Sequence, residues 1–232
     1  MRGLAFVFLI AVITPAIAAE ALSPQTQALV APIHAAYQEI EKRHAALPPP
    51  KDDTERLIRM GEIDQAVRGG IFQKIDLSSI PLSERQGASD EIWAEIGAHD
   101  EANQNALKSI LPSDGWFLKS VYGQDAVQAA WNIVQHAVYD RPWRHNILAS
   151  MEPLVSKGEI SAQAYGMLYD SVAFHDGKPQ RYGSLLICEE HKWMVAPLED
   201  PAHVDPWRRT MGFPQTVEEN FKRITQGRPD YC

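Results

Sequence analysis

Apolar residues recur at helical spacing along most of the chain. After Ser23, the apolar side chains Leu29, Ile33, Tyr37 and Ile40 follow one another every three or four residues, which is the period of one face of an α-helix. Ser23 followed by Pro24 is typical of a helix start, because the hydroxyl can cap a free N–H and proline fits the first helical position. Residues 48–50 are all proline and cannot continue a helix. The pattern predicts a helix over residues 24–47 and then a stiff linker.

The same spacing predicts further helices, each bounded by capping residues, glycine or proline. They are expected after Asp52 or Asp53 (weakening at Gly69-Gly70), after a loop over residues 78–87 with Ser89 as cap, after Gly123, after Arg141-Pro142, after Ser161, and after Pro214. Two short apolar runs, residues 185–188 and 193–196, flank a polar turn and predict a β-hairpin. A lone hairpin is marginal in water, so it should pack on the helices. We expect a mainly α fold, a helical bundle with a small C-terminal antiparallel β-hairpin.

The helix expected after Gly123 contains the segment "WNIVQHAVYD" and should run to Asp140. At about 100° per residue one of its faces is strongly apolar. The remaining arc holds Asp125, Gln128, Asn132, Gln135 and His136. A solvated face is usually rich in lysine and glutamate, yet this arc contains neither and carries groups that make directional hydrogen bonds. It suits the lining of a polar cavity at least as well as open solvent.

The first 18 residues have the pattern of a secretory signal peptide. Arg2 precedes a short apolar run over residues 4–13, too short to span a bilayer, and a small-x-small signal ends at Ala18. We expect cleavage there, a periplasmic or secreted location, and no membrane span in the mature chain. The remainder should consist of an N-terminal amphipathic helix with its proline linker, residues 19–50, and a single mainly helical domain, residues 51–232.

The net charge limits the kinds of partner, and the cysteines suggest a disulfide. The 232-residue chain has a formal net charge of −8 at pH 7, which argues against nucleic acid as a partner, because nucleic acid is a polyanion. A small-molecule or peptide ligand remains open. The two cysteines, Cys188 and Cys232, would meet an oxidising compartment after export. We predict a disulfide between them, which would tie down the C-terminus and stabilise the fold by roughly 4 kcal/mol.

Several well-known sites are missing from the sequence. It contains no His-Glu-x-x-His, no Cys-x-x-Cys and no histidine pair four residues apart, so we assign no standard zinc site. It has no Gly-x-Ser-x-Gly elbow and no phosphate-binding glycine loop. The identity of any cofactor therefore stays open.

Short polar motifs instead follow one another in a characteristic order. They are Asp64-Gln65-x-x-Arg68, Asp100-x-x-Asn103, Gly115-Trp116, Gln135-His136-Ala137, Asp170, Gly177-x-x-Gln180-x-Tyr182-Gly183 and Asp205-x-x-Arg208. Taken singly each is weak; Asp64 and Arg68, for example, could form an ordinary surface ion pair one helical turn apart.

Over roughly residues 55–215 this order resembles a bacterial family known only as a domain of unknown function. The family pattern runs Asp-Gln-x-x-Arg, Gly-Trp-Pro, Gln-His-Ala-Asp and Gln-x-Tyr-Gly-Thr-Gln. The resemblance implies no known activity. The chain departs from the pattern at Phe117 (for proline), Val138 (for aspartate), Ser171 (for arginine) and Ser184-Leu185 (for Thr-Gln). If those missing groups carry chemistry, this member is altered or inactive.

Polar residues on separate helices can converge in a cavity of a helical bundle, and three interpretations follow. In the first, the protein is a hydrolase- or lyase-like enzyme in which His136 is general acid or base and Asp64 or Asp100 orients it. Substrate would be bound by Gln65, Arg68, Asn103, Gln135, Asp170, Gln180, Tyr182 and Arg208. In the second, the protein is a non-catalytic periplasmic binding or interaction module. In the third, His136 and the aspartates bind a divalent metal ion.

Overall fold

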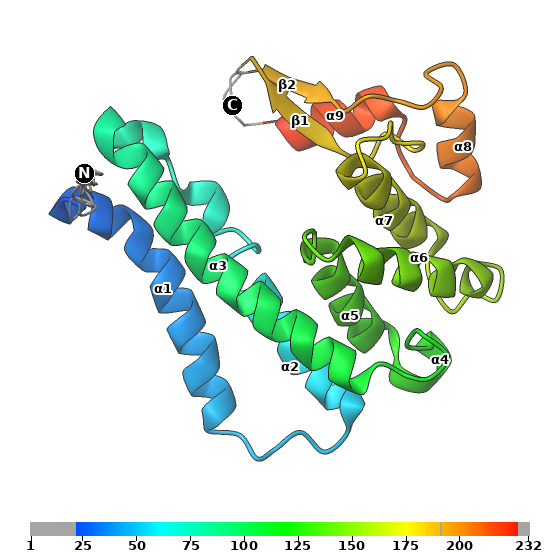
Figure 1. Cartoon of the computed structure of the whole chain (residues 1–232), viewed down its shortest axis with the longest axis horizontal. Coiled ribbons are helices and arrows are strands. Elements are labelled where there is room, and N and C mark those ends of the chain that lie inside the picture. The colour runs from blue at the N-terminus through cyan, green and yellow to red at the C-terminus, as the bar shows by residue number, and fades with distance from the viewer. Residues whose placement is uncertain (1–21, 191, 227–232) are drawn as a thin grey trace, which may run out of the picture.

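The computed structural model describes residues 22–190 and 192–226, which form α-helices and one small sheet (Figure 1). The helices are α1 (Pro24–Ala45), α2 (Asp53–Gln65), α3 (Leu82–Ile110), α4 (Lys119–Tyr122), α5 (Gln124–His136), α6 (Arg141–Val155), α7 (Ala162–His175), α8 (Val204–Thr210) and α9 (Val217–Thr225). Strands β1 (Leu186–Glu189) and β2 (Lys192–Val195) pair antiparallel, and short 3₁₀ turns span Phe72–Lys74 and Leu77–Ser79. The predicted fold class, mainly α with a C-terminal hairpin, is confirmed.

Two apolar cores hold the helices together. The central core lies among α2, α5, α6 and α7, with Leu57, Trp131 and Met151 among its buried side chains. The N-terminal core lies between α1 and α3, where Ile33 and Ile96 are almost fully buried. Figure 1 shows α1 running alongside α3, while α7, the hairpin, α8 and α9 lie on the other side of the molecule. No helix in the described part of the chain is long and apolar enough to cross a membrane.

Helices α2 and α5 approach one another very closely at Gly61. A Cβ built at Gly61 of α2 would lie 2.4 Å from the Cβ of Ala129 on α5, a distance that real side chains do not tolerate. Glycine is therefore required at this position by packing, since the two backbones approach one another too closely for any side chain. The contact fixes the distance between the two helices that carry Asp64 and His136.

Most helix starts follow the sequence prediction. The side chains of Ser23, Asp52 and Ser161 each accept a hydrogen bond from a backbone N–H in the first turn of α1, α2 and α7. Thr216 forms a complete capping box with Glu219 at the start of α9. These polar side chains satisfy N–H groups that have no partner within the helix.

The predicted start of α3 is wrong. The helix begins at Leu82, directly after Pro81, so it runs through part of the expected loop and through Ser89, the expected cap. Proline presets the backbone at a helix start. Gly87 does not interrupt the helix. The side chain of Leu22 packs close to it, because a Cβ added to Gly87 would lie 3.2 Å from Leu22. Packing against the N-terminal segment outweighs the weak local signal of glycine and serine.

The predicted end of α5 is wrong as well. The helix stops at His136, and Ala137 has a non-helical ψ of 46°. Asp140, expected inside α5, instead caps α6 by accepting a hydrogen bond from the backbone N–H of Trp143. His136 therefore lies in the last turn of its helix, next to a short turn in which Tyr139 is exposed.

The C-terminal hairpin is built as predicted, with Cys188 opposite Trp193 in the register of β1 and β2. The hairpin contacts α9. The predicted disulfide partner, Cys232, and the predicted signal peptide lie outside the described residues, so the disulfide and the leader stay predictions.

Replacing Gly61 should show how strictly the α2–α5 contact is set. We expect Gly61→Ala to lower the free energy of unfolding by about 1–3 kcal/mol, because the added methyl overpacks the contact. Ala129→Gly in the same chain should restore part of the loss, since it removes the opposing Cβ. Urea denaturation measures both.

The matched control for this pair is Gly97→Ala, at a helical position where an added Cβ meets nothing within 4 Å. This control should not be destabilised. Equal destabilisation by both glycine substitutions, or no rescue by Ala129→Gly, would contradict the packing argument.

Candidate functional site

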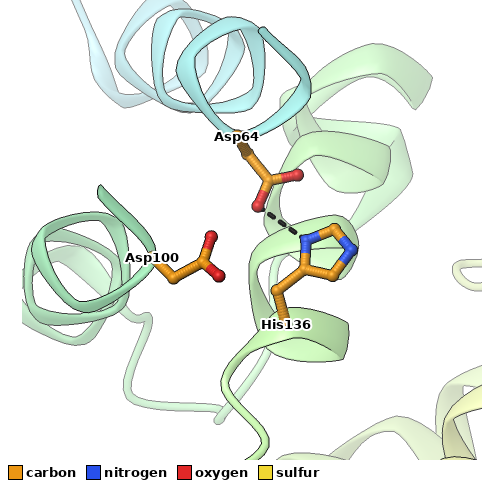
Figure 2. Close-up of side chains that lie close together, drawn as sticks. All are labelled: Asp64, Asp100 and His136. Atoms are coloured by element: carbon orange, nitrogen blue, oxygen red, sulfur yellow. Dashed lines mark hydrogen bonds and ion pairs between the residues drawn. The ribbon is translucent and has the colours of Figure 1, made fainter. Parts of the chain in front are cut away.

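Three helices bring Asp64, Asp100 and His136 together (Figure 2). Asp64 lies at the end of α2, Asp100 on α3 and His136 at the end of α5. One potential ligand atom from each of the three residues lies within 4.8 Å of the other two. The three residues are far apart in sequence, so their meeting is a product of the fold.

A short hydrogen bond links Asp64 to His136. The Oδ1 atom of Asp64 lies 2.8 Å from Nδ1 of His136. Asp64 is 1% exposed, whereas 29% of the His136 side chain is exposed. An ionised carboxylate can only accept, so Nδ1 carries the proton in this bond. The second ring nitrogen points away from both carboxylates (Figure 2), and within the described residues it has no hydrogen-bond partner.

The other oxygen of Asp64 is held by its neighbour. Gln65 donates from Nε2 to Oδ2 of Asp64 at 2.6 Å. Both oxygens of this buried carboxylate therefore have hydrogen-bond partners, which a buried charge requires. Gln65, which we predicted to bind substrate, thus also helps to position Asp64.

Arg68 clamps Asp100 with two parallel bonds. Its two terminal nitrogens donate to the two carboxylate oxygens of Asp100 at 2.9 and 2.6 Å, and one of them also donates to the backbone carbonyl of Asp64 at 2.8 Å. Burial by itself lowers the pKa of the guanidinium, but the hydrogen bonds and charge of Asp100 outweigh it, so the pKa of Arg68 lies above its usual value. Such two-pronged pairing fixes geometry as well as charge.

Tyr37 of α1 lies close enough to this ion pair to feel the charges of Arg68 and Asp100. Its ring stacks on His99 with the ring centroids 3.8 Å apart, and the residue is 1% exposed. Burial raises the pKa of Tyr37 well above its usual value, although the nearby charge of Arg68 opposes the shift. Its hydroxyl has no hydrogen-bond partner in the described part of the chain. The sequence indicated Tyr37 only as a core position of the first helix, so its place beside the site was missed.

Two open cavities flank His136, one of about 540 Å³ and one of about 520 Å³. Both are lined by Gly97, Asp100, His136 and Tyr139. The first extends over polar side chains, including Glu101, Gln104 and Asp140. The second extends over Arg68, Trp93 and Val138. Volumes of this size suit a small-molecule ligand. Val138, one of the departures from the resembled pattern, therefore lies at the site itself.

Two other predicted binding residues lie near the triad without facing a cavity. Asn103 is buried on α3 and donates to the backbone carbonyl of Met60 at 3.2 Å. This bond ties α3 to α2. Gln135 is half-buried on α5, next to His136 in sequence.

The remaining predicted residues form a second cluster around the entry to the hairpin. Asp170 of α7 is fully buried and accepts backbone N–H bonds from Arg181, Tyr182 and Ser184 at 2.8 to 2.9 Å. Burial raises the pKa of Asp170, and the three backbone bonds oppose that shift. Asp170 therefore organises a loop in the C-terminal part of the chain.

Gln180 and Arg208 complete this cluster. The side chain of Gln180 is fully buried and bonds to the backbone of Leu185 and Ala196. Arg208 donates to the carbonyls of Gln215 and Tyr182 at 2.7 and 2.6 Å. The Tyr182 ring stacks on Phe213.

Most of the predicted site residues thus fall into two separate clusters. Asp64, Asp100, His136, Gln65 and Arg68 come together. Asp170 and Arg208 both bond to the backbone of Tyr182, and Gln180 bonds to the neighbouring backbone of Leu185 and Ala196. None of these four residues is among those that line the two cavities beside His136.

The chain belongs to a family of unknown function, DUF6624, whose sequence pattern matches residues 51–227. This confirms the resemblance to an uncharacterised family. No curated protein and no solved structure matches the chain. The matched region begins after α1, so Tyr37 lies outside it.

Removing the Asp170 carboxylate should destabilise the fold. We expect Asp170→Ala to lower the free energy of unfolding by about 3–5 kcal/mol, because three backbone N–H groups lose their acceptor in a buried setting. Urea denaturation followed by circular dichroism measures this. Asp200→Ala is the matched control, since Asp200 caps an exposed turn, and it should leave the midpoint nearly unchanged. A stable Asp170→Ala protein would contradict a structural role.

Proposed function

We propose that this protein is an enzyme that uses the Asp64–His136 pair for general acid–base catalysis, in a hydrolytic or lyase-type reaction on a small or peptidic substrate. One observation carries the proposal: a buried carboxylate holds Nδ1 of a partly exposed histidine, and the other ring nitrogen is left without a partner among the described residues. A carboxylate in this position orients the imidazole and stabilises its charged form.

The charges around His136 support a role in proton transfer. Asp64 and Asp100 carry two negative charges, and Arg68 carries one positive charge. With a neutral imidazole the cluster has one excess negative charge, and uptake of a proton by His136 balances it. The site can therefore hold the proton that a general base removes, without leaving an unpaired buried charge.

The lining of the cavities narrows the type of reaction. No serine, cysteine or threonine lines either cavity in the part of the chain that the structure describes. This favours activation of a water molecule or direct abstraction of a substrate proton over a covalent intermediate on serine, threonine or cysteine. The signal peptide predicted over residues 1–18 would place the reaction in the periplasm or outside the cell.

The test is a substitution that removes the titrating ring and keeps a donor for Asp64. We expect His136→Gln to reduce turnover at least 100-fold, with the melting temperature within about 3 °C of the wild type, because the glutamine amide can still bond to the buried carboxylate. The assay is a panel of chromogenic esters, amides and glycosides together with elimination substrates.

His203→Ala is the matched control, since His203 also bonds to an aspartate but is exposed. It should keep full activity. Full activity in His136→Gln would overturn the proposal, as would loss of activity that only follows unfolding.

A divalent metal ion held by Asp64, Asp100 and His136 is the second candidate, because their ligand atoms lie within 4.8 Å of one another. Histidine with carboxylates suits several transition metals. The bonds of Arg68 to both oxygens of Asp100 weigh against it, since a metal ion would have to displace the guanidinium from this carboxylate.

Metal titration distinguishes the two candidates. We expect wild-type protein, purified without chelator, to contain no stoichiometric metal and to bind Mn²⁺ or Zn²⁺ weakly in calorimetry. Arg68→Met should bind these ions more tightly, because it frees Asp100. One metal ion per wild-type chain by elemental analysis would instead favour the metal site.

A further inference from the structure

One face of α3 forms the wall that both cavities share. Trp93, Gly97 and Asp100 follow one another at spacings of four and three residues, so they lie on one side of the helix. Glu101 and Gln104 continue the same side into the polar cavity. The neighbouring face of α3, with Ile92 and Ile96, is buried in the N-terminal core.

Gly97 is a glycine that the fold does not need. It lies inside a 29-residue helix, its φ is not positive, and a Cβ built on it meets nothing within 4 Å. Glycine weakens a helix interior relative to alanine because it loses more backbone freedom on folding. At Gly61 close packing explains the glycine. At Gly97 no packing contact explains the glycine. The space that a side chain would fill there instead belongs to the two cavities.

Two aromatic rings flank this space. Tyr139 is 98% exposed and Trp93 is 54% exposed, and both line the apolar cavity together with Val138. Tyrosine and tryptophan rings offer broad flat faces on which another ring can stack. Such exposed rings beside a histidine that is available for proton transfer indicate a surface for a ligand.

The polar cavity offers acceptors to that ligand. Gln104 uses its Nε2 to donate to Asp140 at 2.9 Å, so its carbonyl oxygen remains available. Asp140 also accepts from Lys108, and Asp100 is held by Arg68. Glu101 is exposed and has no hydrogen-bond partner within the described residues. The ligand groups that fit this side are hydrogen-bond donors.

We infer that Gly97 makes room for a ring of the substrate, which stacks against Tyr139, lies beside Trp93 and donates hydrogen bonds to Glu101 and Gln104. The shared chemistry is a ring with an apolar face and donor groups at its edge, and both a sugar ring and an aromatic amine have it. The place of this ring as substrate, next to the reacting nitrogen of His136, rests on the proposed function.

Filling the space above Gly97 tests the inference. The probes are a neutral trimer of N-acetylglucosamine and the aromatic amine tryptamine, each titrated against the full chain by calorimetry and ligand-detected NMR. We expect one probe to bind the wild type, and Gly97→Leu to weaken its binding at least tenfold. Ala98→Leu, the neighbouring exposed position on α3, should leave binding unchanged.

A second pair of variants removes a ring without adding bulk. Tyr139→Ala should weaken binding of the same probe at least tenfold, and Val121→Ala, which shortens an exposed side chain of α4, should not. Gly97→Ala should raise the melting temperature by about 2 °C, confirming that the glycine is kept at a cost to stability.

The outcomes separate the inference from the acid–base proposal. Whether the sugar or the amine binds shows which of the two kinds of ring the site accepts. Binding that survives in His136→Gln and is lost in Gly97→Leu supports the ring site whether or not His136 is catalytic. Binding of neither probe at millimolar concentration, or equal binding by wild type and Gly97→Leu, overturns the inference and leaves the test of His136 intact.

Discussion

The close approach of α2 and α5 is the constraint on which the candidate site depends. Where Gly61 faces Ala129, neither backbone leaves room for a larger group. Asp64 follows Gly61 by about one helical turn, and His136 follows Ala129 by about two. The contact therefore holds the carboxylate and the imidazole at hydrogen-bond distance through rigid backbone, without relying on flexible side chains. A site that moves protons benefits from this, because small errors in position are costly.

The third helix is joined to this pair by polar contacts. The amide of Asn103 ties α3 to the backbone of α2, and Arg68 reaches from the end of α2 to Asp100. The arginine thus links two helices and balances two carboxylates at once. Apolar packing sets the distance between α2 and α5, and hydrogen bonds set the position of α3 relative to both.

The sequence predicted the helical elements well where local chemistry decides them. Ser23, Asp52 and Ser161 are caps because their side chains satisfy nearby N–H groups, an effect that needs no tertiary contact. The prediction failed at Ser89 and at the end of α5, where packing decides. From the sequence, Asp140 could be the last residue of α5 or the N-cap of α6. Only the three-dimensional arrangement shows that it caps α6.

The candidate site was predictable in part. The order of the motifs, which matches that of a family, pointed to Asp64, Asp100 and His136 on separate helices. The motif residues Asp170, Gln180 and Arg208 proved to hold backbone segments together, and sequence patterns do not separate that role from ligand binding. Tyr37 and Gly97 gave no polar signal at all. A buried tyrosine looks like any core residue, and a glycine in a helix looks like a local weakness.

Tyr37 lies beside the site but outside the region that matches the family. The Tyr37 ring, whose electrostatic surroundings include Arg68 and Asp100, comes from α1, ahead of the region that matches the family. Charges interact more strongly where water is excluded, because the local dielectric constant is lower. A relative with the same motifs but without this helix would hold the same ion pair in a wetter setting. The N-terminal helix thus contributes to the electrostatic surroundings of the site without supplying any of its motif residues.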